Sequence, residues 1–179
     1  MNLTINQNIT HATMQDVDEL EQLYNELIDH LQTTTNYPCW VKDVYPTRET
    51  AEIGIGKNNL FILKVNNEIA GTIILNHEPE HGYDTAKWQI DAKEDEFFVI
   101  HTLAIHPKFL GQGIGFQLLQ FAKEYAIQNK MKSIRLDVTV KNEPAIALYQ
   151  KCGYQYIDTV DLGLNRPDLK WFKLFELVL

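Results

Sequence analysis

A strand that leads through a glycine-rich turn into a helix is the most restrictive feature of this chain. A β-rich run from Glu96 to Ile105 precedes the turn GQGIG at residues 111–115, and a helical hydrophobic period then continues to about Asn129. Glycine lets a ligand approach the backbone closely, and the first amides of a helix have no carbonyl partner within it. The turn therefore predicts a site for an anion such as a pyrophosphate. A tight turn without any ligand would use the same glycines.

The spacing of these glycines argues against two common nucleotide-binding loops. In the dinucleotide-binding pattern GxGxxG the third glycine comes one residue later than Gly115 does here. No GKS or GKT sequence follows the turn, as a phosphate-binding loop would require. Taken alone, the turn indicates an anion without naming it.

The rest of the chain is predicted to alternate between helices and strands. Helices are expected at Thr13–Leu31, where Thr13 and Asp16 are spaced as an N-cap and its acidic partner, from Pro46 to about Gly56, and in a short segment with Pro144 in its first turn and Gly153 at its end. Strands are expected at Leu60–Val65, Glu68–Leu75, Ile134–Val140, Tyr154–Leu162 and Lys170–Leu177, with Asn66-Asn67 as the hairpin turn between the first two. With a first strand near the N-terminus the order is βααβββαβαββ, which predicts an α/β protein with a mixed sheet and helices on both faces.

The composition is that of an ordinary globular domain. The chain has 179 residues, 45% of them hydrophobic, so a core without disulfides or structural metals is expected, with residues 1–179 as one domain. The net charge of −8 argues against nucleic acid and anionic membranes as partners. No apolar run approaches the roughly 20 residues that span a bilayer, and the first residues lack a signal-peptide pattern, so the expected location is the cytoplasm. Cys39 and Cys152 are isolated and are expected to be reduced.

The sequence HEPEH at residues 77–81 formally matches the zinc-protease pattern HExxH. Metal binding by that pattern needs both histidines one turn apart on a helix. Pro79 lies between them here, and Gly82 follows in a turn-rich segment. We therefore expect no metal site.

A second motif, RLDVTVKNEPAIALYQKCGY at residues 135–154, changes the interpretation of the glycine turn. It predicts a strand, an asparagine-led turn and a helix that presents Tyr149. Together with LAIHPKFLGQGIG at residues 103–115, it resembles the GNAT family of acyl-CoA-dependent N-acyltransferases, closely over residues 97–154 and more loosely elsewhere. The resemblance implies the GNAT fold, with about seven strands in a mixed, mostly antiparallel sheet and about four helices. It also implies acetyl transfer from acetyl-CoA to a primary amine by direct attack.

The resemblance further implies which residues bind acetyl-CoA. The backbone of Leu103, Ala104 and Ile105 is similar to the strand end that pairs with the pantetheine arm and polarises the thioester carbonyl. The pyrophosphate-binding turn corresponds to Gly111, Gln112, Gly113, Ile114, Gly115 and Phe116. Asn142 is similar to the turn residue that hydrogen-bonds the pantetheine. The family usually has Arg or Gln where this chain has Leu110, and nearby cations that could compensate are Lys108, Lys141 and Lys151.

The same resemblance implies a general acid but leaves the base open. Tyr149 is similar to the tyrosine that protonates the departing thiolate, although it could also pack as the aromatic member of an amphipathic stripe. Histone acetyltransferases of this family use a strand glutamate as base, and Val99 occupies that position here. The remaining candidates are His101, Asp137 and an ordered water.

The acceptor site is expected to lie among aromatic residues of irregular segments. Trp40, Tyr37, Tyr45 and His77 are its candidate walls, and the acidic balance mildly favours a cationic amine, on a small molecule or a peptide. A non-catalytic acyl-CoA sensor or interaction protein of the same fold is the alternative, supported by Leu110 and the unassigned base. Dimers are common in the family, so a homodimer stays open, but no sequence feature identifies an interface.

Overall fold

The computed structural model describes residues 8–179, which form two compact units. Unit 1 contains the described residues up to Asn36 together with Trp40–Leu75 and His101–Ala122. Unit 2 contains Tyr37–Cys39, Asn76–Ile100 and Lys123–Leu179.

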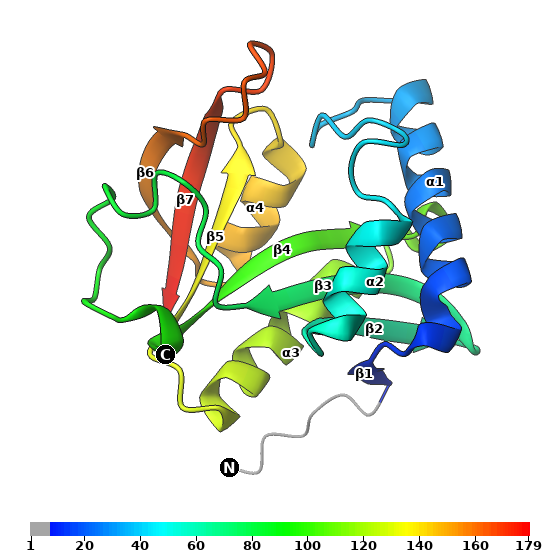
Figure 1. The fold of residues 1–179 in the computed structure, drawn as a ribbon, viewed down its shortest axis with the longest axis horizontal. Helices are drawn as coiled ribbons and strands as arrows, with labels where there is room; N and C mark the ends of the chain where they lie inside the picture. The colour runs from blue at the N-terminus through cyan, green and yellow to red at the C-terminus, as the bar shows by residue number, and fades with distance from the viewer. Residues whose placement is uncertain (1–7) are drawn as a thin grey trace. The chain divides into compact units, whose positions relative to one another are not determined.

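Within the described residues, seven strands and four α-helices follow one another in the predicted order (Figure 1). The strands are β1 (Ile9–His11), β2 (Leu60–Val65), β3 (Glu68–Asn76), β4 (Phe97–Ile105), β5 (Ser133–Thr139), β6 (Gln155–Asp161) and β7 (Trp171–Val178). The helices are α1 (Val17–Thr33), α2 (Arg48–Gly56), α3 (Ile114–Gln128) and α4 (Glu143–Lys151). No helix of this part of the chain is long and apolar enough to cross a membrane.

The strands pair in the order β1-β2-β3-β4-β5-β7-β6. Antiparallel ladders join β1 to β2, β2 to β3, β5 to β7 and β6 to β7, while β4 and β5 are parallel. The first residues of β4 belong to unit 2 and the last ones to unit 1, so each unit contains a part of this sheet. The predicted mixed, mostly antiparallel sheet of about seven strands is confirmed.

The β2–β3 hairpin is the centre of unit 1. Its turn, Asn66-Asn67, has φ angles of 51° and 65°, the left-handed conformation that asparagine tolerates in a tight hairpin, as predicted. Side chains then alternate between two faces: Leu60 and Ile62 share a buried cluster with residues of α1 and α2, whereas the ring of Phe61 lies 4.9 Å from that of Phe121 on α3. Within unit 1, helices therefore cover both faces of the strands (Figure 1).

A capping box precedes the first helix. The backbone N–H of Thr13 donates to Asp16 Oδ2 at 2.8 Å, as the spacing predicts. A 3-10 turn at Met14–Asp16 comes first, so α1 begins at Val17, later than the predicted start at Thr13. Burial raises the pKa of Asp16, but its hydrogen bonds with Lys64, at 2.7 Å, and with Thr13 outweigh burial and leave the pKa below its ordinary value.

Unit 2 has helices on one face of its strands and a long loop, residues 77–93, on the other. Side chains of β7 alternate between the two: the ring of Phe175 lies 6.4 Å from that of Tyr149 on α4, whereas Leu174 belongs to a buried cluster with Tyr83 of the loop. The loop therefore replaces a helix as the cover of this face.

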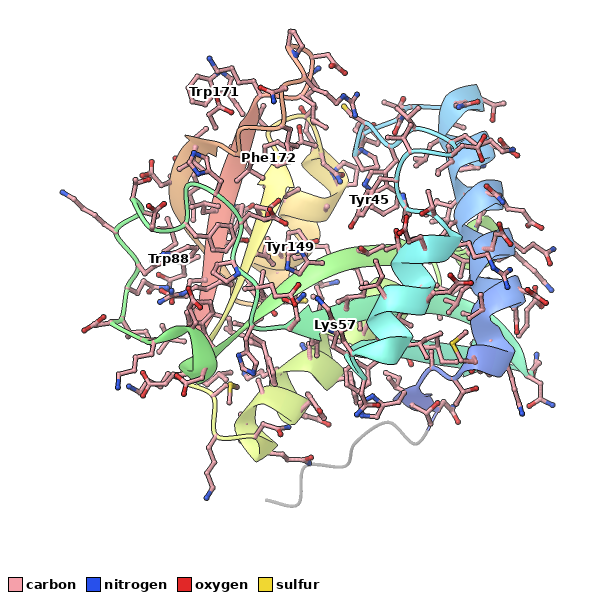
Figure 2. The ribbon with its side chains drawn as sticks, in the orientation of Figure 1. Tyr45, Lys57, Trp88, Tyr149, Trp171 and Phe172 are labelled. Atoms are coloured by element: carbon pink, nitrogen blue, oxygen red, sulfur yellow. The ribbon has the colours of Figure 1, made fainter. Side chains whose placement is uncertain are left out.

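A buried ion pair holds this loop on the strands. Arg135 Nε on β5 donates to Glu176 Oε1 on β7 at 2.9 Å, and the two side chains are only 5% and 0% exposed. The guanidinium lies 4.3 Å from the ring of Trp88 and donates to the Ile90 carbonyl at 3.1 Å, while the Gln89 N–H donates to Glu176 Oε2 at 2.7 Å. Because buried charges need both a partner and hydrogen bonds, this pair fixes the path of the loop across the strands. Figure 2 shows Trp88 on this face.

Candidate functional site

Strand β4 changes conformation at Thr102. This residue has a φ of 47° and is 7% exposed. A β-branched residue with positive φ is a strained outlier that its surroundings must hold. The parallel ladder between β4 and β5 joins Phe97–Ile100 to Ser133–Leu136 and ends just before this point. The backbone of Leu103–Ile105, predicted to contact the cofactor, therefore lies beyond the ladder.

Gly71 of β3 allows both the end of β4 and the start of α3 to pack closely against this strand. A Cβ added at Gly71 would lie 3.1 Å from the Ala104 carbonyl oxygen and 2.8 Å from Ile114 Cγ2. The His106 N–H donates to the Ala70 carbonyl at 2.9 Å, directly after β4. Within unit 1 these contacts fix the strand end next to the helix start.

The glycine turn before α3 is open to solvent. Gly111 and Gly113 have φ angles of 75° and 76°, a region that other residues adopt only at a cost. A Cβ added at either glycine would meet no heavy atom within 4 Å. Leu110, in place of the family's usual Arg or Gln, is 47% exposed beside them.

The backbone amides of this turn are arranged to receive an anion. The Gln117 N–H reaches the Gly113 carbonyl at 3.0 Å and begins the regular helical bonding of α3. Within residues 8–179, no acceptor lies in hydrogen-bond geometry of the amides that precede it at Gly111, Gly113, Ile114 and Gly115. The side chain of Gln112 turns back instead and donates to the Lys108 carbonyl at 3.1 Å. Amides grouped at a helix N-terminus are a favourable site for a phosphate group.

One of the predicted acceptor-site aromatics, Tyr45, contacts β4 within unit 1, and a second, Trp40, packs against Tyr45. The hydroxyl groups of Tyr45 and Thr102 are hydrogen-bonded to each other, and the Tyr45 ring stands edge-on to Trp40, with centroids 6.1 Å apart. The side chain of Asn36 holds the backbone of Trp40 through bonds of 2.7 and 3.1 Å. His101, the candidate base next to Thr102, is partly buried. Figure 2 labels Tyr45.

Tyr149, the predicted acid, is a buried residue of α4 in unit 2. Its ring makes an edge contact with Tyr154, with centroids 5.9 Å apart, and packs on Phe175. Figure 2 labels Tyr149. Burial raises the pKa of the Tyr149 hydroxyl well above its ordinary value, and the negative charge of Asp137 raises it further. The phenol is therefore neutral at physiological pH and has a proton to give.

Asp137, a candidate base on β5, receives a hydrogen bond that the sequence did not predict. The hydroxyl of Tyr83, in the loop of residues 77–93, donates to Asp137 Oδ2 at 2.8 Å. Burial of Tyr83 and the charge of Asp137 both raise the pKa of this phenol, so it stays protonated and acts as the donor.

The remaining candidate cofactor-binding residues lie at the two ends of α4. Asn142 is its N-cap, and Asn142 Oδ1 accepts the Ala145 N–H at 3.3 Å. Lys151 is exposed at the other end. Of the other cations, Lys108 is ion-paired with Glu68, and Lys141 Nζ donates to a backbone carbonyl at 2.7 Å.

His77, a predicted acceptor-site residue, is held by the backbone at the start of β4. Its Nδ1 atom lies 2.7 Å from the Phe97 carbonyl oxygen and 3.0 Å from that of Glu94. A carbonyl oxygen only accepts, so Nδ1 carries the proton and Nε2 is the acceptor nitrogen of the ring. Residues 77–81 are not helical, so HEPEH does not form the zinc-binding arrangement. Across residues 8–179, no group of three or more His, Cys, Asp or Glu side chains is arranged to hold a metal ion.

Each unit thus contains part of the predicted site. Unit 1 brings together the end of β4, the turn at residues 111–116 and the pair of Trp40 and Tyr45, and unit 2 brings Asp137 near Tyr149. Sequence reasoning missed Thr102 and Tyr83. A threonine in a strand is ordinary, and Tyr83 lies in an irregular segment without periodicity, so no sequence signal marks either one.

The chain belongs to the acetyltransferase (GNAT) family, whose sequence profile matches residues 20–154. An acetyltransferase of the GNAT family from Streptococcus agalactiae has the same fold: the TM-score is 0.77, the alignment covers 99% of each chain, and the identity is 22%. This confirms the fold that the two motifs predicted.

Two curated relatives are also similar in sequence. The uncharacterized N-acetyltransferase YesJ of Bacillus subtilis is 29% identical over 122 residues, which are 68% of this chain and 62% of YesJ. A streptothricin acetyltransferase of Escherichia coli is 31% identical over 90 residues, which are 50% of this chain and 43% of that enzyme. The similarity therefore spans about two fifths to three fifths of the length of these relatives.

Proposed function

We propose that this protein transfers the acetyl group of acetyl-CoA to a primary amine. The observation that supports this most directly is the open turn at residues 111–115, which lies next to the end of β4. Its amides at Gly111, Gly113, Ile114 and Gly115 lack acceptors among the described residues. Membership of the GNAT family and the names of both curated relatives indicate the same class of reaction.

The residues present fit acetyl-CoA. Amides of the segment Gly111–Phe116 would bind the pyrophosphate, and glycine at positions 111 and 113 leaves open the space that a Cβ would take. The backbone of Leu103–Ile105, beyond the ladder with β5, would pair with the pantetheine arm. Asn142 and Lys151 complete the proposed set of residues that bind acetyl-CoA. Leu110 contributes no charge, so the backbone would carry more of the binding than in relatives with Arg or Gln.

The chemistry requires one group that accepts a proton and one that donates a proton. Acetyl-CoA supplies the acetyl group as a thioester, whose carbonyl carbon the amine attacks while the C–S bond breaks. Backbone amides near Leu103 would polarise the carbonyl, since fixed dipoles need no reorganisation. Tyr149 would give its proton to the sulfur. The ammonium nitrogen loses two protons in all: one restores the phenol, and the other is released to solvent.

The proton acceptor is proposed to be His101, Asp137 or a water. His101 is partly buried on β4, and Asp137 interacts electrostatically with Tyr149. A group that accepts a proton near neutral pH suits the removal of a proton from an ammonium.

We propose a cationic acceptor, on a small molecule or at a peptide end. Trp40 and Tyr45 offer aromatic faces, which attract cations, and His77 Nε2 can accept a hydrogen bond from an ammonium. The net charge of −8 favours the approach of a cation. The proposed location is the cytoplasm, with which the reduced state of Cys39 and Cys152 agrees. A homodimer stays a prediction.

Calorimetric titration with acetyl-CoA, with CoA, and with NAD as a negative control tests the cofactor site. Micromolar binding of acetyl-CoA without binding of NAD is expected. Acetylation of streptothricin, spermidine and a basic peptide is then followed by mass spectrometry, because thiol reagents could also react with Cys39 and Cys152. Absence of acetyl-CoA binding would refute the proposal.

Replacement of the proposed acid tests the chemistry. Tyr149→Phe should lower kcat by about 10²–10⁴-fold and leave the Kd for acetyl-CoA unchanged. Tyr154→Phe removes another buried phenol of unit 2 and is the matched control, with kcat near that of the wild type. Equal rates for Tyr149→Phe and the wild type would exclude Tyr149 as the acid.

A non-catalytic acyl-CoA sensor is the second candidate. The exposed Leu110, where the family usually has Arg or Gln, favours a sensor because weaker binding of the cofactor suits reversible sensing. A sensor would bind acetyl-CoA in the calorimeter and acetylate none of the amines.

A further inference from the structure

Tyr83 belongs to no helix or strand, yet its side chain is firmly placed. It is buried in the cluster beneath the loop of residues 77–93, and its ring lies 5.2 Å from that of Trp88. The Trp88 Nε1–H donates to the Tyr83 carbonyl at 2.8 Å, and the Tyr83 N–H donates to the Glu80 carbonyl at 3.2 Å. Gly82, with a φ of 90°, brings the backbone so close to β6 that an added Cβ would lie 3.2 Å from the Asp161 carbonyl oxygen.

This placement directs the Tyr83 hydroxyl at Asp137. The 2.8 Å bond joins groups 54 residues apart in the sequence, so the fold of the loop creates it. A phenol that donates to a carboxylate stabilises the ionised form and fixes one of its oxygens. On the loop side of the strands, Asp137 shares its face with Arg135 of β5 and Glu176 of β7, which form an ion pair. Glu80 of the loop acts on the Tyr83 hydroxyl, and Asp137 itself acts on Tyr149 of α4.

Asp137 also interacts with the proposed acid. It shares one face of the strands with Arg135, on the side of the loop, whereas Tyr149 packs on Phe175 of the opposite face. The ladder to β4 ends at Leu136, so β5 has no partner from that ladder beside Asp137. The charge of the carboxylate raises the pKa of the Tyr149 phenol.

We propose that Tyr83 is a positioning residue that keeps Asp137 ionised and oriented as the proton acceptor for the amine. This role rests on the proposed function and assigns the base that sequence motifs left open. The loop of residues 77–93, which the family motifs do not include, thereby becomes part of the catalytic apparatus.

The proton transfers balance in this assignment. An ammonium proton passes to an Asp137 carboxylate oxygen and leaves a neutral amine, which forms the new C–N bond. Neutral Asp137 no longer raises the pKa of Tyr149, so the phenol gives its proton to the sulfur more readily as the C–S bond breaks. The second nitrogen proton restores the phenol, and Asp137 releases its proton to solvent, one per turnover.

The pH dependence of kcat/KM tests the role of Tyr83. Tyr83→Phe keeps the ring in its cluster and removes the donor, so Asp137 should protonate at higher pH and the acid limb should move up by about one pH unit. Asp137→Asn should lose that limb and most of the activity. Tyr154→Phe, which removes a buried phenol not bonded to Asp137, should leave the limb in place.

A measurement without turnover separates this inference from the proposed function. The titration of carboxyl-labelled aspartates is followed by carbon NMR, with the Asp137 signal identified by its loss in Asp137→Asn. The Asp137 midpoint should lie higher in Tyr83→Phe than in the wild type. Turnover by the wild type with an unshifted midpoint and limb in Tyr83→Phe would overturn the inference alone. Absence of turnover with every amine would overturn the proposed function and this inference with it.

Discussion

Replacing Gly113 with alanine separates backbone strain from ligand contact in the glycine turn. Gly113 has a φ of 76°, where a residue with a Cβ costs about 1–2 kcal/mol. No steric term adds to this cost, because the new Cβ would meet no heavy atom of the protein within 4 Å. For a chain of 179 residues, this loss corresponds to a fall in Tm of about 2–8 °C.

The same methyl group should also weaken the binding of acetyl-CoA. If the pyrophosphate lies against the amides of Gly113 and Ile114, the methyl group occupies space that the phosphate oxygens need. The Kd for acetyl-CoA should then rise at least about tenfold, which corresponds to about 1.4 kcal/mol. Calorimetric titration well below the Tm of the variant measures this change, and thermal unfolding of the same sample measures the strain.

Gly163→Ala provides the matched control. Gly163 has a φ of 70° and lies between β6 and β7, where an added Cβ would come 3.3 Å from a ring carbon of His81. Gly163→Ala should lower the Tm at least as much as Gly113→Ala and leave the Kd for acetyl-CoA unchanged. If Gly113→Ala also leaves the Kd unchanged while its Tm falls, the pyrophosphate does not bind at this turn.

Three further changes test other parts of the structure. Arg135→Met leaves Glu176 buried without its ion-pair partner, so the free energy of unfolding in urea should fall by about 3–5 kcal/mol, whereas Lys170→Met at an exposed pair should change it by under about 1 kcal/mol. Folding lowers the pKa of Asp16, so its contribution to stability is complete above the pKa of the unfolded carboxyl and is lost as pH falls through the folded pKa. In thermal unfolding, Asp16→Asn should therefore destabilise the protein at pH 7 and progressively less as the pH falls. Tyr45→Phe removes a hydrogen bond to β4 and should raise the amine KM by about fivefold, with the acetyl-CoA Kd unchanged in the calorimeter.

The order of elements could be predicted because local patterns determine it. The spacing of hydrophobic residues is helical in α3 and alternating in β5, so it distinguishes the two elements. Asn66-Asn67 marks the turn of the β2–β3 hairpin because asparagine tolerates positive φ. The start of α1 was predicted too early because the N-cap at Thr13 serves a 3-10 turn first. The path of residues 77–93 could not be predicted, since their anchor is the ion pair between Arg135 and Glu176, 41 residues apart and outside the loop itself.

The parts of the candidate site differ in the same way: some are determined by the local sequence and others by residues far away in the chain. The glycine turn is local, because glycine itself permits the conformation that exposes the amides. The environment of Asp137 is not local, because its donor, Tyr83, is placed by a loop that packs on Arg135. It follows that the buried ion pair should influence the chemistry as well as stability: if Arg135→Met loosens the loop, the Asp137 midpoint should rise as it does in Tyr83→Phe. A midpoint unchanged in Arg135→Met, despite the loss of stability, would show that the Tyr83 hydrogen bond does not depend on this anchor.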